Sequence, residues 1–286
     1  MENLSKFITD RAALLEKAGI DQGKAEIELI LCHLLGLERL QLYLEGGRLL
    51  TDEILECFDG IMKRRLERYP LQYILGESWF YGRRFAVSEA VMVPTPETEL
   101  LCELALKHIR DKGPDVPRLL DVGVGSGVIA VTLAGELKRA EIVALDISED
   151  ALEIARKNAA ELGGTDKIEF RRSDLFAAVK PGEKFDLILS NPPYITDEDY
   201  RGLPPEVLAD PKIALVAGER GLDVIEKIIA RAPDFLEPGG KLMFEIGYNQ
   251  AAWVAELTEK DNRYRSIDIV RDLNDIDRVV ILGIGD

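Results

Sequence analysis

The stretch that decides the fold is LLDVGVGSGVIAVTLAG, residues 119–135. An apolar run around Asp121 leads into a glycine-rich turn, Gly123 to Gly127, and a helical pattern follows the turn. A turn of this kind between a strand and a helix lets a ligand approach the backbone closely, with the helix N-terminus behind it. The stretch therefore predicts the first strand–turn–helix unit of a nucleotide-binding α/β sheet.

The same alternation continues to the end of the chain. Further apolar runs occupy residues 141–146, 167–174, 185–190, 241–247 and 278–284, and helical patterns lie between most of them. Strands that are continuously apolar and alternate with helices are typical of a parallel sheet covered on both faces. We therefore predict a Rossmann-like α/β fold for this part of the chain.

The first part of the chain has a different pattern. Residues 1–68 contain only helical patterns, and Thr51 is placed to cap one of the helices. Residues 69–99 are rich in aromatic and β-branched residues in short runs split by glycines, which predicts a β-hairpin or an extended linker. We predict a helical domain at residues 1–75, a β-hairpin linker at 76–96 and the sheet domain at 97–286.

Composition narrows the class of protein. The 286 residues are 47% hydrophobic and carry a net charge of −16, and the first 90 have 12 basic against 15 acidic side chains. A nucleic-acid partner would require a basic face, so none is expected. Three scattered cysteines and two histidines in helical patterns predict reduced thiols and no metal site. With no signal peptide or long apolar stretch, we expect a cytoplasmic monomer with no membrane partner.

The glycine turn favours one cofactor class over another. Its spacing is GxGxG, whereas the dinucleotide fingerprint is GxGxxG, and Val128 occupies the sixth position. Asp121 before the turn would repel a pyrophosphate but suits a ligand that carries an ammonium and a sulfonium group. These two details favour S-adenosylmethionine over NAD.

Two acids at later strand ends extend the predicted cofactor site. Asp146 ends the second strand and could accept both hydroxyls of a ribose, although it could also serve as the first residue of the next helix. Asp174 follows the third strand and could accept an adenine amino group, with Leu175 or Phe176 covering the ring. For Asp174 a plain loop acid is an equally good interpretation.

The fourth strand ends in SNPPYI, Ser190 to Ile195. An amide nitrogen or aromatic amine is a poor nucleophile, but two acceptors that hold both of its N–H groups can turn it toward a methyl donor. The side-chain oxygen of Asn191 and the carbonyl of Pro192 could be those acceptors, and the prolines would fix them in place. Tyr194 offers a flat face for stacking. A plain turn that ends the strand is the alternative, but after a GxGxG turn and an acid at the end of the second strand the motif predicts methylation of a planar NH2 group.

Together these motifs resemble class I S-adenosylmethionine-dependent methyltransferases of the amino-methylating branch. The stretches PLQYILGESWFYGRRFAV, VPTPETE, DPKIALVAGERGLDVI and GGKLMFEIGYNQ are more specifically similar to the release factor glutamine methyltransferases, the HemK/PrmC family. The resemblance covers essentially the whole chain. It implies a mostly parallel sheet with an antiparallel last strand, and a helical domain that helps to dock the substrate.

The resemblance also implies a reaction. The family transfers a methyl group from S-adenosylmethionine to the side-chain amide nitrogen of the glutamine in the Gly-Gly-Gln loop of peptide chain release factors, and S-adenosylhomocysteine is the product. The predicted catalytic residues are Asn191, Pro192 and Tyr194, and the substrate-binding residues are Asn191, Pro192, Pro193 and Tyr194. The predicted cofactor-binding residues are Asp121, Gly123, Val124, Gly125, Ser126, Gly127, Asp146, Asp174, Leu175 and Asn191.

The chain departs from the family pattern at three positions, of which Val124 in the glycine turn stands where threonine is more usual, and the residues alone leave alternatives open. Thr95 stands where the family usually has arginine, and Glu97 where it usually has aspartate. A glutamine methyltransferase acting on a ribosomal protein is the nearest alternative, and a nucleic-acid adenine methyltransferase is a weaker one. An NAD-dependent oxidoreductase is disfavoured by the glycine spacing, and a non-catalytic binding module by the intact cofactor positions.

Overall fold

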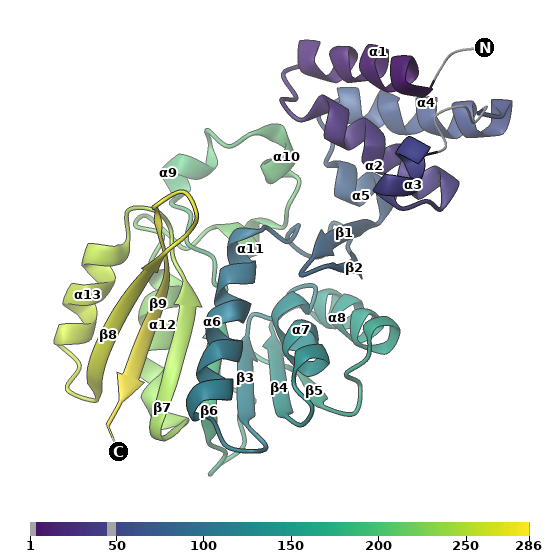
Figure 1. Cartoon of the computed structure of the whole chain (residues 1–286). Helices are drawn as coiled ribbons and strands as arrows, with labels where there is room; N and C mark the ends of the chain where they lie inside the picture. The colour runs from purple at the N-terminus through teal and green to yellow at the C-terminus, as the bar shows by residue number, and fades with distance from the viewer. Residues whose placement is uncertain (1–3, 45–49, 286) are drawn as a thin grey trace. The chain divides into compact units, whose positions relative to one another are not determined.

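The computed structural model describes residues 4–44 and 50–285, and the chain divides into two compact units (Figure 1). Unit 1 comprises Met1–Gly76 together with Pro204–Ala209, and unit 2 comprises Glu77–Leu203 and Asp210–Asp286. The chain therefore leaves the second unit once, at Leu203, and returns to it at Asp210. No helix in the described part of the chain is both long and apolar enough to cross a membrane.

Unit 1 is helical, as its sequence pattern predicts. Its apolar side chains form one core, in which Leu15, Ile27 and Phe58 are fully buried. The hydroxyl of Thr51 accepts a hydrogen bond from the backbone of Ile54, so the predicted cap is present. The helices are α1 (Leu4–Lys17), α2 (Gly23–Leu35), α3 (Arg39–Leu44), α4 (Asp52–Leu66), α5 (Leu71–Leu75) and α10 (Pro205–Leu208).

An ion-pair cluster holds α10 within unit 1. Arg65 near the end of α4 is buried, and its guanidinium lies 2.6 Å from Glu26 and 2.8 Å from Glu206. Arg68 makes a second contact to Glu206 at 2.6 Å. Because a buried guanidinium needs partners, the two carboxylates fix the position of this arginine and of the short helix that carries Glu206.

Unit 2 begins with a β-hairpin and continues as an α/β sheet. Strands β1 (Glu77–Phe80) and β2 (Arg83–Ala86) pair antiparallel, as the aromatic segment predicts. The sheet contains β3 (Arg118–Val122), β4 (Glu141–Asp146), β5 (Ile168–Arg172), β6 (Phe185–Ser190), β7 (Leu236–Glu245), β8 (Tyr264–Arg271) and β9 (Asp277–Ile284). The helices are α6 (Glu97–Lys112), α7 (Val128–Glu136), α8 (Glu149–Leu162), α9 (Asp197–Tyr200), α11 (Lys212–Leu215), α12 (Asp223–Arg231), η1 (Ala232–Asp234) and α13 (Ala251–Glu259).

The seven strands follow the order β5-β4-β3-β6-β7-β9-β8, and only the pairs that involve β9 are antiparallel. The predicted mostly parallel fold is thereby confirmed, although β8 was not predicted. In its sequence, YRSIDIVR, polar residues interrupt the apolar ones, because β8 forms the edge of the sheet and is partly exposed. A half-exposed edge strand lacks the continuous apolar run by which the other strands were found.

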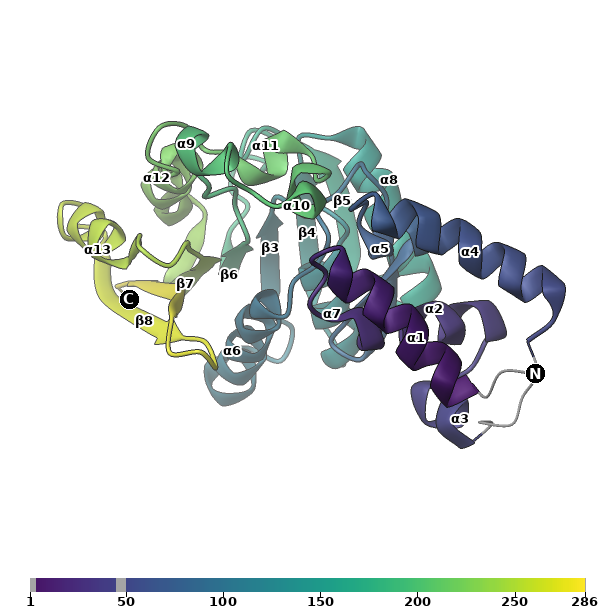
Figure 2. The same cartoon turned by 90° about the horizontal axis from the view of Figure 1, so that it is seen from above.

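Apolar side chains divide between the two faces of the sheet. Leu119, Leu187 and Leu189 pack on the face covered by α6, α7 and α8, whereas Leu120 and Ile188 pack on the face covered by α12 and α13. Seen from above, α6 and α12 lie on opposite sides of the sheet (Figure 2). Both faces are buried, which explains why the central strands are apolar throughout.

The strand order creates a reversal at the centre of the sheet. From β3 the chain first adds β4 and β5 on one side, and then β6 and β7 on the other. A crevice outside the carboxyl ends of the strands at such a reversal is where open α/β sheets bind ligands. The ends of β3, β4 and β6 carry the glycine turn, Asp146 and Asn191, so all three predicted motifs meet at this edge.

Candidate active site

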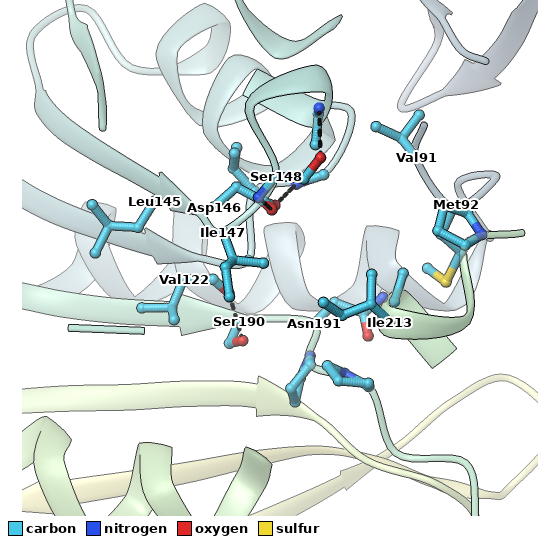
Figure 3. A pocket seen from close by; sticks show the side chains of 18 of the residues that line it. Val91, Met92, Val122, Leu145, Asp146, Ile147, Ser148, Ser190, Asn191 and Ile213 are labelled. Atoms are coloured by element: carbon cyan, nitrogen blue, oxygen red, sulfur yellow. Dashed lines mark hydrogen bonds between the residues drawn. The ribbon is translucent and has the colours of Figure 1, made fainter. Parts of the chain in front are cut away.

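A pocket of about 470 Å³ lies at this edge of the sheet, within unit 2 (Figure 3). Its walls include the glycine turn, the end of β4, the turn after β6, the segment around Met92 and the helix α11 with Ile213. Figure 3 shows Asp146 and Ser148 side by side, with Met92, Asn191 and Ile213 on other parts of the wall. This volume suits a molecule of cofactor size.

The glycine turn provides a backbone surface for a ligand. Gly123, Gly125 and Gly127 all have positive φ, a conformation that side-chain-bearing residues rarely adopt. A Cβ added at Gly123 or Gly125 would meet no atom within 4 Å, whereas one at Gly127 would lie 3.2 Å from the Cβ of Ala155. The first two glycines therefore leave space at the pocket wall, and the third permits close packing of α7 against α8.

Asp146 fixes the turn and still has acceptor capacity. One of its carboxylate oxygens accepts the N–H of Gly125 at 2.9 Å, and the other accepts the N–H of Ser148 at 2.9 Å. Ser148 in turn caps α8 through the N–H of Ala151. A carboxylate can accept about four hydrogen bonds, so Asp146 can also receive hydroxyl donors from a ligand.

Asp121 is buried behind the turn and does not line the pocket. Its exposed fraction is 1%, and one carboxylate oxygen accepts the N–H of Ala130 at 3.1 Å. The other oxygen has no hydrogen-bond partner among the described residues. Burial raises the pKa of Asp121 to about 7, and the nearby charge of Asp146 adds to the increase. Asp121 therefore stabilises the first turn of α7 from behind the glycine turn, without contact to the pocket wall.

Asp174 and Leu175, which follow strand β5, lie on the pocket wall. Leu175 has a φ of 48°, which is uncommon for a residue with a branched side chain. The hydroxyl of Ser173 holds this bend by donating to the carbonyl of Leu175 at 2.6 Å. Phe176 is buried and stacks on Phe235, so of the two residues expected to cover an adenine ring only Leu175 is available.

The turn after β6 places Asn191, Pro192 and Pro193 on the pocket wall. The hydroxyl of Ser190 donates to the carbonyl of Val122 at 2.7 Å, which ties the ends of the two central strands together. The Nδ2 of Asn191 donates to the hydroxyl of Thr98 at 2.9 Å. Neither Oδ1 of Asn191 nor the carbonyl oxygen of Pro192 has a partner in the described part of the chain, so both are free to accept a ligand N–H.

Tyr194 does not line the pocket, unlike its neighbours in the turn. Its hydroxyl donates to Glu245 at 3.1 Å, its ring packs against the core, and burial raises its pKa. Gln250 holds the same segment by donating to the carbonyls of Tyr194 and Gly221, both at 3.0 Å. The structure therefore assigns Tyr194 an anchoring role in the turn, and the expected stacking on its face stays a prediction.

Four residues near the site were not predicted from sequence: Thr98, Asn158, Glu245 and Gln250. Glu245 is 1% exposed at the end of β7, and its other oxygen accepts the hydroxyl of Thr98 at 2.8 Å. Asn158 bonds both the backbone of Ala86 and the carbonyl of Ser126, so it joins the hairpin to the glycine turn. An acid that ends an apolar strand, as Glu245 does, is the signal that could have revealed this network.

Among residues 4–44 and 50–285, no group of three histidine, cysteine, aspartate or glutamate side chains is placed to hold a metal ion. The polar groups of the pocket are a backbone turn, carboxylates and an amide. Such a wall can bind hydroxyl and amino groups.

Comparison with family models covers both units. The PrmC N-terminal domain matches residues 8–76, and the methyltransferase small domain matches residues 98–216. Among solved structures, a methyltransferase from Pyrococcus furiosus has a TM-score of 0.52 at 19% identity, covering 72% of this chain and 91% of its own. A 16S rRNA methyltransferase of Thermus thermophilus has a TM-score of 0.51 at 18% identity, covering 73% and 49%. The fold is that of the class I methyltransferases.

Curated relatives narrow the class to one family. A release factor glutamine methyltransferase of Chlorobaculum tepidum is 41% identical over 93% of this chain and 92% of its own length. Proteins of the same name from Bacillus cereus and Neisseria gonorrhoeae are 37% and 40% identical, covering 94% and 90% of this chain and 95% and 92% of their own. The chain belongs to the release factor glutamine methyltransferase family and is an enzyme.

Proposed function

We propose that this enzyme transfers the methyl group of S-adenosylmethionine to the side-chain amide nitrogen of the glutamine in the Gly-Gly-Gln loop of peptide chain release factors. The observation that carries the proposal is the position of Asn191 and Pro192. Their free oxygens lie on the wall of the same pocket as the glycine turn and Asp146. Relatives at about 40% identity that bear the name of this activity support it.

The residues present fit S-adenosylmethionine. Gly123 and Gly125 line the pocket and leave open space beside the backbone, and Asp146 retains acceptor capacity for ribose hydroxyls. Leu175, held with positive φ, would lie against the adenine, and Asp174 beside it could accept the amino group. When bound, the cofactor supplies a methyl group on a positively charged sulfur, which becomes a neutral thioether as the new N–C bond forms and the S–C bond breaks.

The turn after β6 would then prepare the acceptor nitrogen. Oδ1 of Asn191 and the carbonyl of Pro192 accept its two N–H groups, which draws the lone pair out of conjugation with the glutamine carbonyl and aims it. The rings of Pro192 and Pro193 hold these acceptors before the substrate arrives. The methylated nitrogen releases one proton to water, so the site needs no strong base.

We further propose that unit 1 helps to dock the release factor. Its support is the match of residues 8–76 to the N-terminal domain of this family. The pocket would bind only the planar amide of the glutamine side chain. Unit 1 would bind other parts of the protein substrate.

Mass spectrometry of a purified release factor incubated with the enzyme and S-adenosylmethionine tests the function. We expect a mass gain of one CH2, located by fragmentation on the glutamine of the Gly-Gly-Gln loop. A release factor with that glutamine replaced by asparagine is the control and should remain unmodified. An unmodified release factor, together with methylation of a ribosomal protein that is incubated with the enzyme and S-adenosylmethionine in the same way, would contradict the proposal and favour the alternative substrate.

A further inference from the structure

A chain of three hydrogen bonds runs from the pocket wall into the core of unit 2. The Nδ2 of Asn191 donates to Thr98 at 2.9 Å, Thr98 donates to Glu245 at 2.8 Å, and Tyr194 donates to the other oxygen of Glu245 at 3.1 Å. Thr98 and Glu245 are 2% and 1% exposed. The four side chains come from α6, the turn after β6 and the end of β7, so their meeting depends on the packing of three elements.

The direction of these hydrogen bonds is determined by chemistry. A carboxylate only accepts hydrogen bonds, whereas a hydroxyl has a single hydrogen to donate. With Glu245 as the acceptor, the hydrogen of Thr98 points to Glu245, and Thr98 can only accept from Asn191. The Asn191 amide must therefore direct its NH2 toward Thr98, which leaves Oδ1 for the pocket.

Among the described residues, Thr95 is the other residue with a hydroxyl close enough to compete for the hydrogen of Thr98. The hydroxyl of Thr95 lies 3.5 Å from that of Thr98, which is longer than a good hydroxyl–hydroxyl hydrogen bond. Both oxygens of Glu245 accept hydrogen bonds from hydroxyl donors, and its side chain is 1% exposed. The observed chain is therefore the arrangement in which each of these polar groups is satisfied.

The orientation of the Asn191 amide decides whether the site can bind an NH2 group. The two ends of an amide have the same shape but opposite polarity. If the amide rotated by half a turn, two N–H donors would face the donors of the substrate, and the acceptor required for methyl transfer would be lost. A small rotation would thus convert a complementary site into a repulsive one.

We propose that Thr98 and Glu245 are positioning residues that fix the Asn191 amide with its oxygen toward the substrate nitrogen. The proposal rests on the proposed function, because only an NH2 acceptor requires that oxygen. Neither residue reacts. Because Thr98 donates its hydrogen to Glu245, its oxygen can only accept a hydrogen bond from Asn191. Glu245 also accepts a hydrogen bond from the hydroxyl of Tyr194, which anchors the far end of the turn.

Two substitutions at position 98 separate positioning from packing. Thr98→Val keeps the shape of the side chain but removes the hydroxyl, and we expect kcat to fall by about 10- to 100-fold. Thr98→Ser keeps the hydroxyl but removes the methyl group, so it should stay within about 3-fold of the wild-type kcat, even where its melting temperature is lower. The dissociation constant for S-adenosylmethionine should change by less than about 3-fold in both variants.

Thr132→Val is the matched control. Thr132 is buried on α7, and its hydroxyl has no hydrogen-bond partner in the described residues. The same loss of a buried hydroxyl should therefore leave kcat unchanged.

The experiment measures initial rates of methyl transfer to a release factor over a range of factor concentrations, with calorimetry for S-adenosylmethionine and a melting curve for each protein. A large loss of kcat in Thr98→Val and its rescue in Thr98→Ser support the positioning role. Wild-type kcat in Thr98→Val, or equal losses in the two variants, would overturn it alone. Absence of transfer by the wild-type enzyme would overturn the proposed function and the positioning role together.

Discussion

The two halves of the pocket, the glycine turn and the turn after β6, present different chemical groups to a ligand. The glycine turn presents backbone groups, which are fixed by positive φ values and by the single carboxylate of Asp146. The turn after β6 presents the side-chain amide of Asn191, whose orientation depends on Thr98 and Glu245. The backbone conformation of the glycine turn is determined by a short local motif. The orientation of the Asn191 side chain is determined by residues that lie far away in the sequence. The two halves should therefore respond differently to substitution.

The largest expected effect is on the Asn191 half. Asn191→Ala removes one of the two acceptors that aim the nitrogen, so we expect kcat to fall by about 100- to 1000-fold, as for loss of a preorganised catalytic hydrogen bond. The dissociation constant for S-adenosylmethionine should change by less than about 3-fold. Initial-rate kinetics and calorimetry on the same preparation measure both quantities.

The exposed Asn262→Ala variant is the control for the first prediction and should match the wild type. Turnover of Asn191→Ala within a few-fold of wild type would show that the amide oxygen is not needed.

The second largest effect is on the glycine half. Asp146→Ala removes the acceptor of the Gly125 N–H and the expected ribose partner. We expect the dissociation constant for S-adenosylmethionine to rise by about 10- to 100-fold. At saturating cofactor, kcat should fall much less than in Asn191→Ala. If instead Asp146→Ala binds normally but turns over slowly, the division of the pocket into a cofactor half and a substrate half is wrong.

The third prediction concerns pH. Burial raises the pKa of Glu245 to about 7 and Glu97 on α6 adds to the increase, while the hydroxyls of Thr98 and Tyr194 and the charge of Arg278 on β9 oppose it. A protonated Glu245 can donate to Thr98 and release the Asn191 amide. The wild-type kcat should therefore fall as the pH decreases through about 7.

The Glu245→Gln variant tests the origin of that profile. It cannot ionise at position 245, so its kcat should be lower than wild type at about pH 8 and should lack the inflection near 7. Asp121, whose pKa burial also raises to about 7, is present in both proteins and cancels in the comparison. An unchanged inflection in the variant would assign the titration to another group.

The sign is opposite for stability. Because the folded pKa of Glu245 lies above its ordinary value, its contribution to the free energy of unfolding is present at low pH and is lost as the pH rises through about 7. Chemical denaturation of both proteins at about pH 5 and about pH 8 should thus show a smaller decrease for Glu245→Gln than for wild type. A decrease of the same size in both would contradict the raised pKa.

The smallest expected effect is a difference between alanine substitutions at two glycines of the same turn, Gly125 and Gly127. Alanine is strained at either position because φ is positive, but only at Gly127 would its Cβ press on Ala155 at 3.2 Å. Gly127→Ala should therefore lower the melting temperature by a few degrees more than Gly125→Ala. Gly125→Ala should weaken cofactor binding more, because Gly125 lines the pocket whereas Gly127 does not. Thermal melts and calorimetry compare the pair, and the reverse ranking in either would contradict the assignment.

The glycine half of the pocket could be predicted from sequence because its determinants are local. The spacing of Gly123, Gly125 and Gly127 sets the turn, and an acid at the end of the following strand must reach the same edge of a parallel sheet. Six of the seven strands in the sheet could be predicted because each contains an apolar run. The edge strand β8 was missed because polar residues interrupt its sequence.

The support of Asn191 could not be predicted in this way. Thr98 lies 93 positions from Asn191 and 147 from Glu245 along the chain, and nothing in the NPPY motif indicates either partner. The role of Tyr194 was expected from the chemistry of its ring, but packing turns its hydroxyl to Glu245. Similarly, Phe176 follows the adenine-side strand in sequence but stacks on Phe235 in the core.

A crystal structure of the enzyme with S-adenosylhomocysteine and a glutamine-containing release factor would show directly whether Asn191 and Pro192 hold the acceptor nitrogen. We expect the substrate amide nitrogen within about 3.2 Å of both Oδ1 of Asn191 and the carbonyl oxygen of Pro192, with Nδ2 of Asn191 still hydrogen-bonded to Thr98. A glutamine bound through its carbonyl oxygen to Nδ2 of Asn191, or bound outside this pocket, would contradict this expectation.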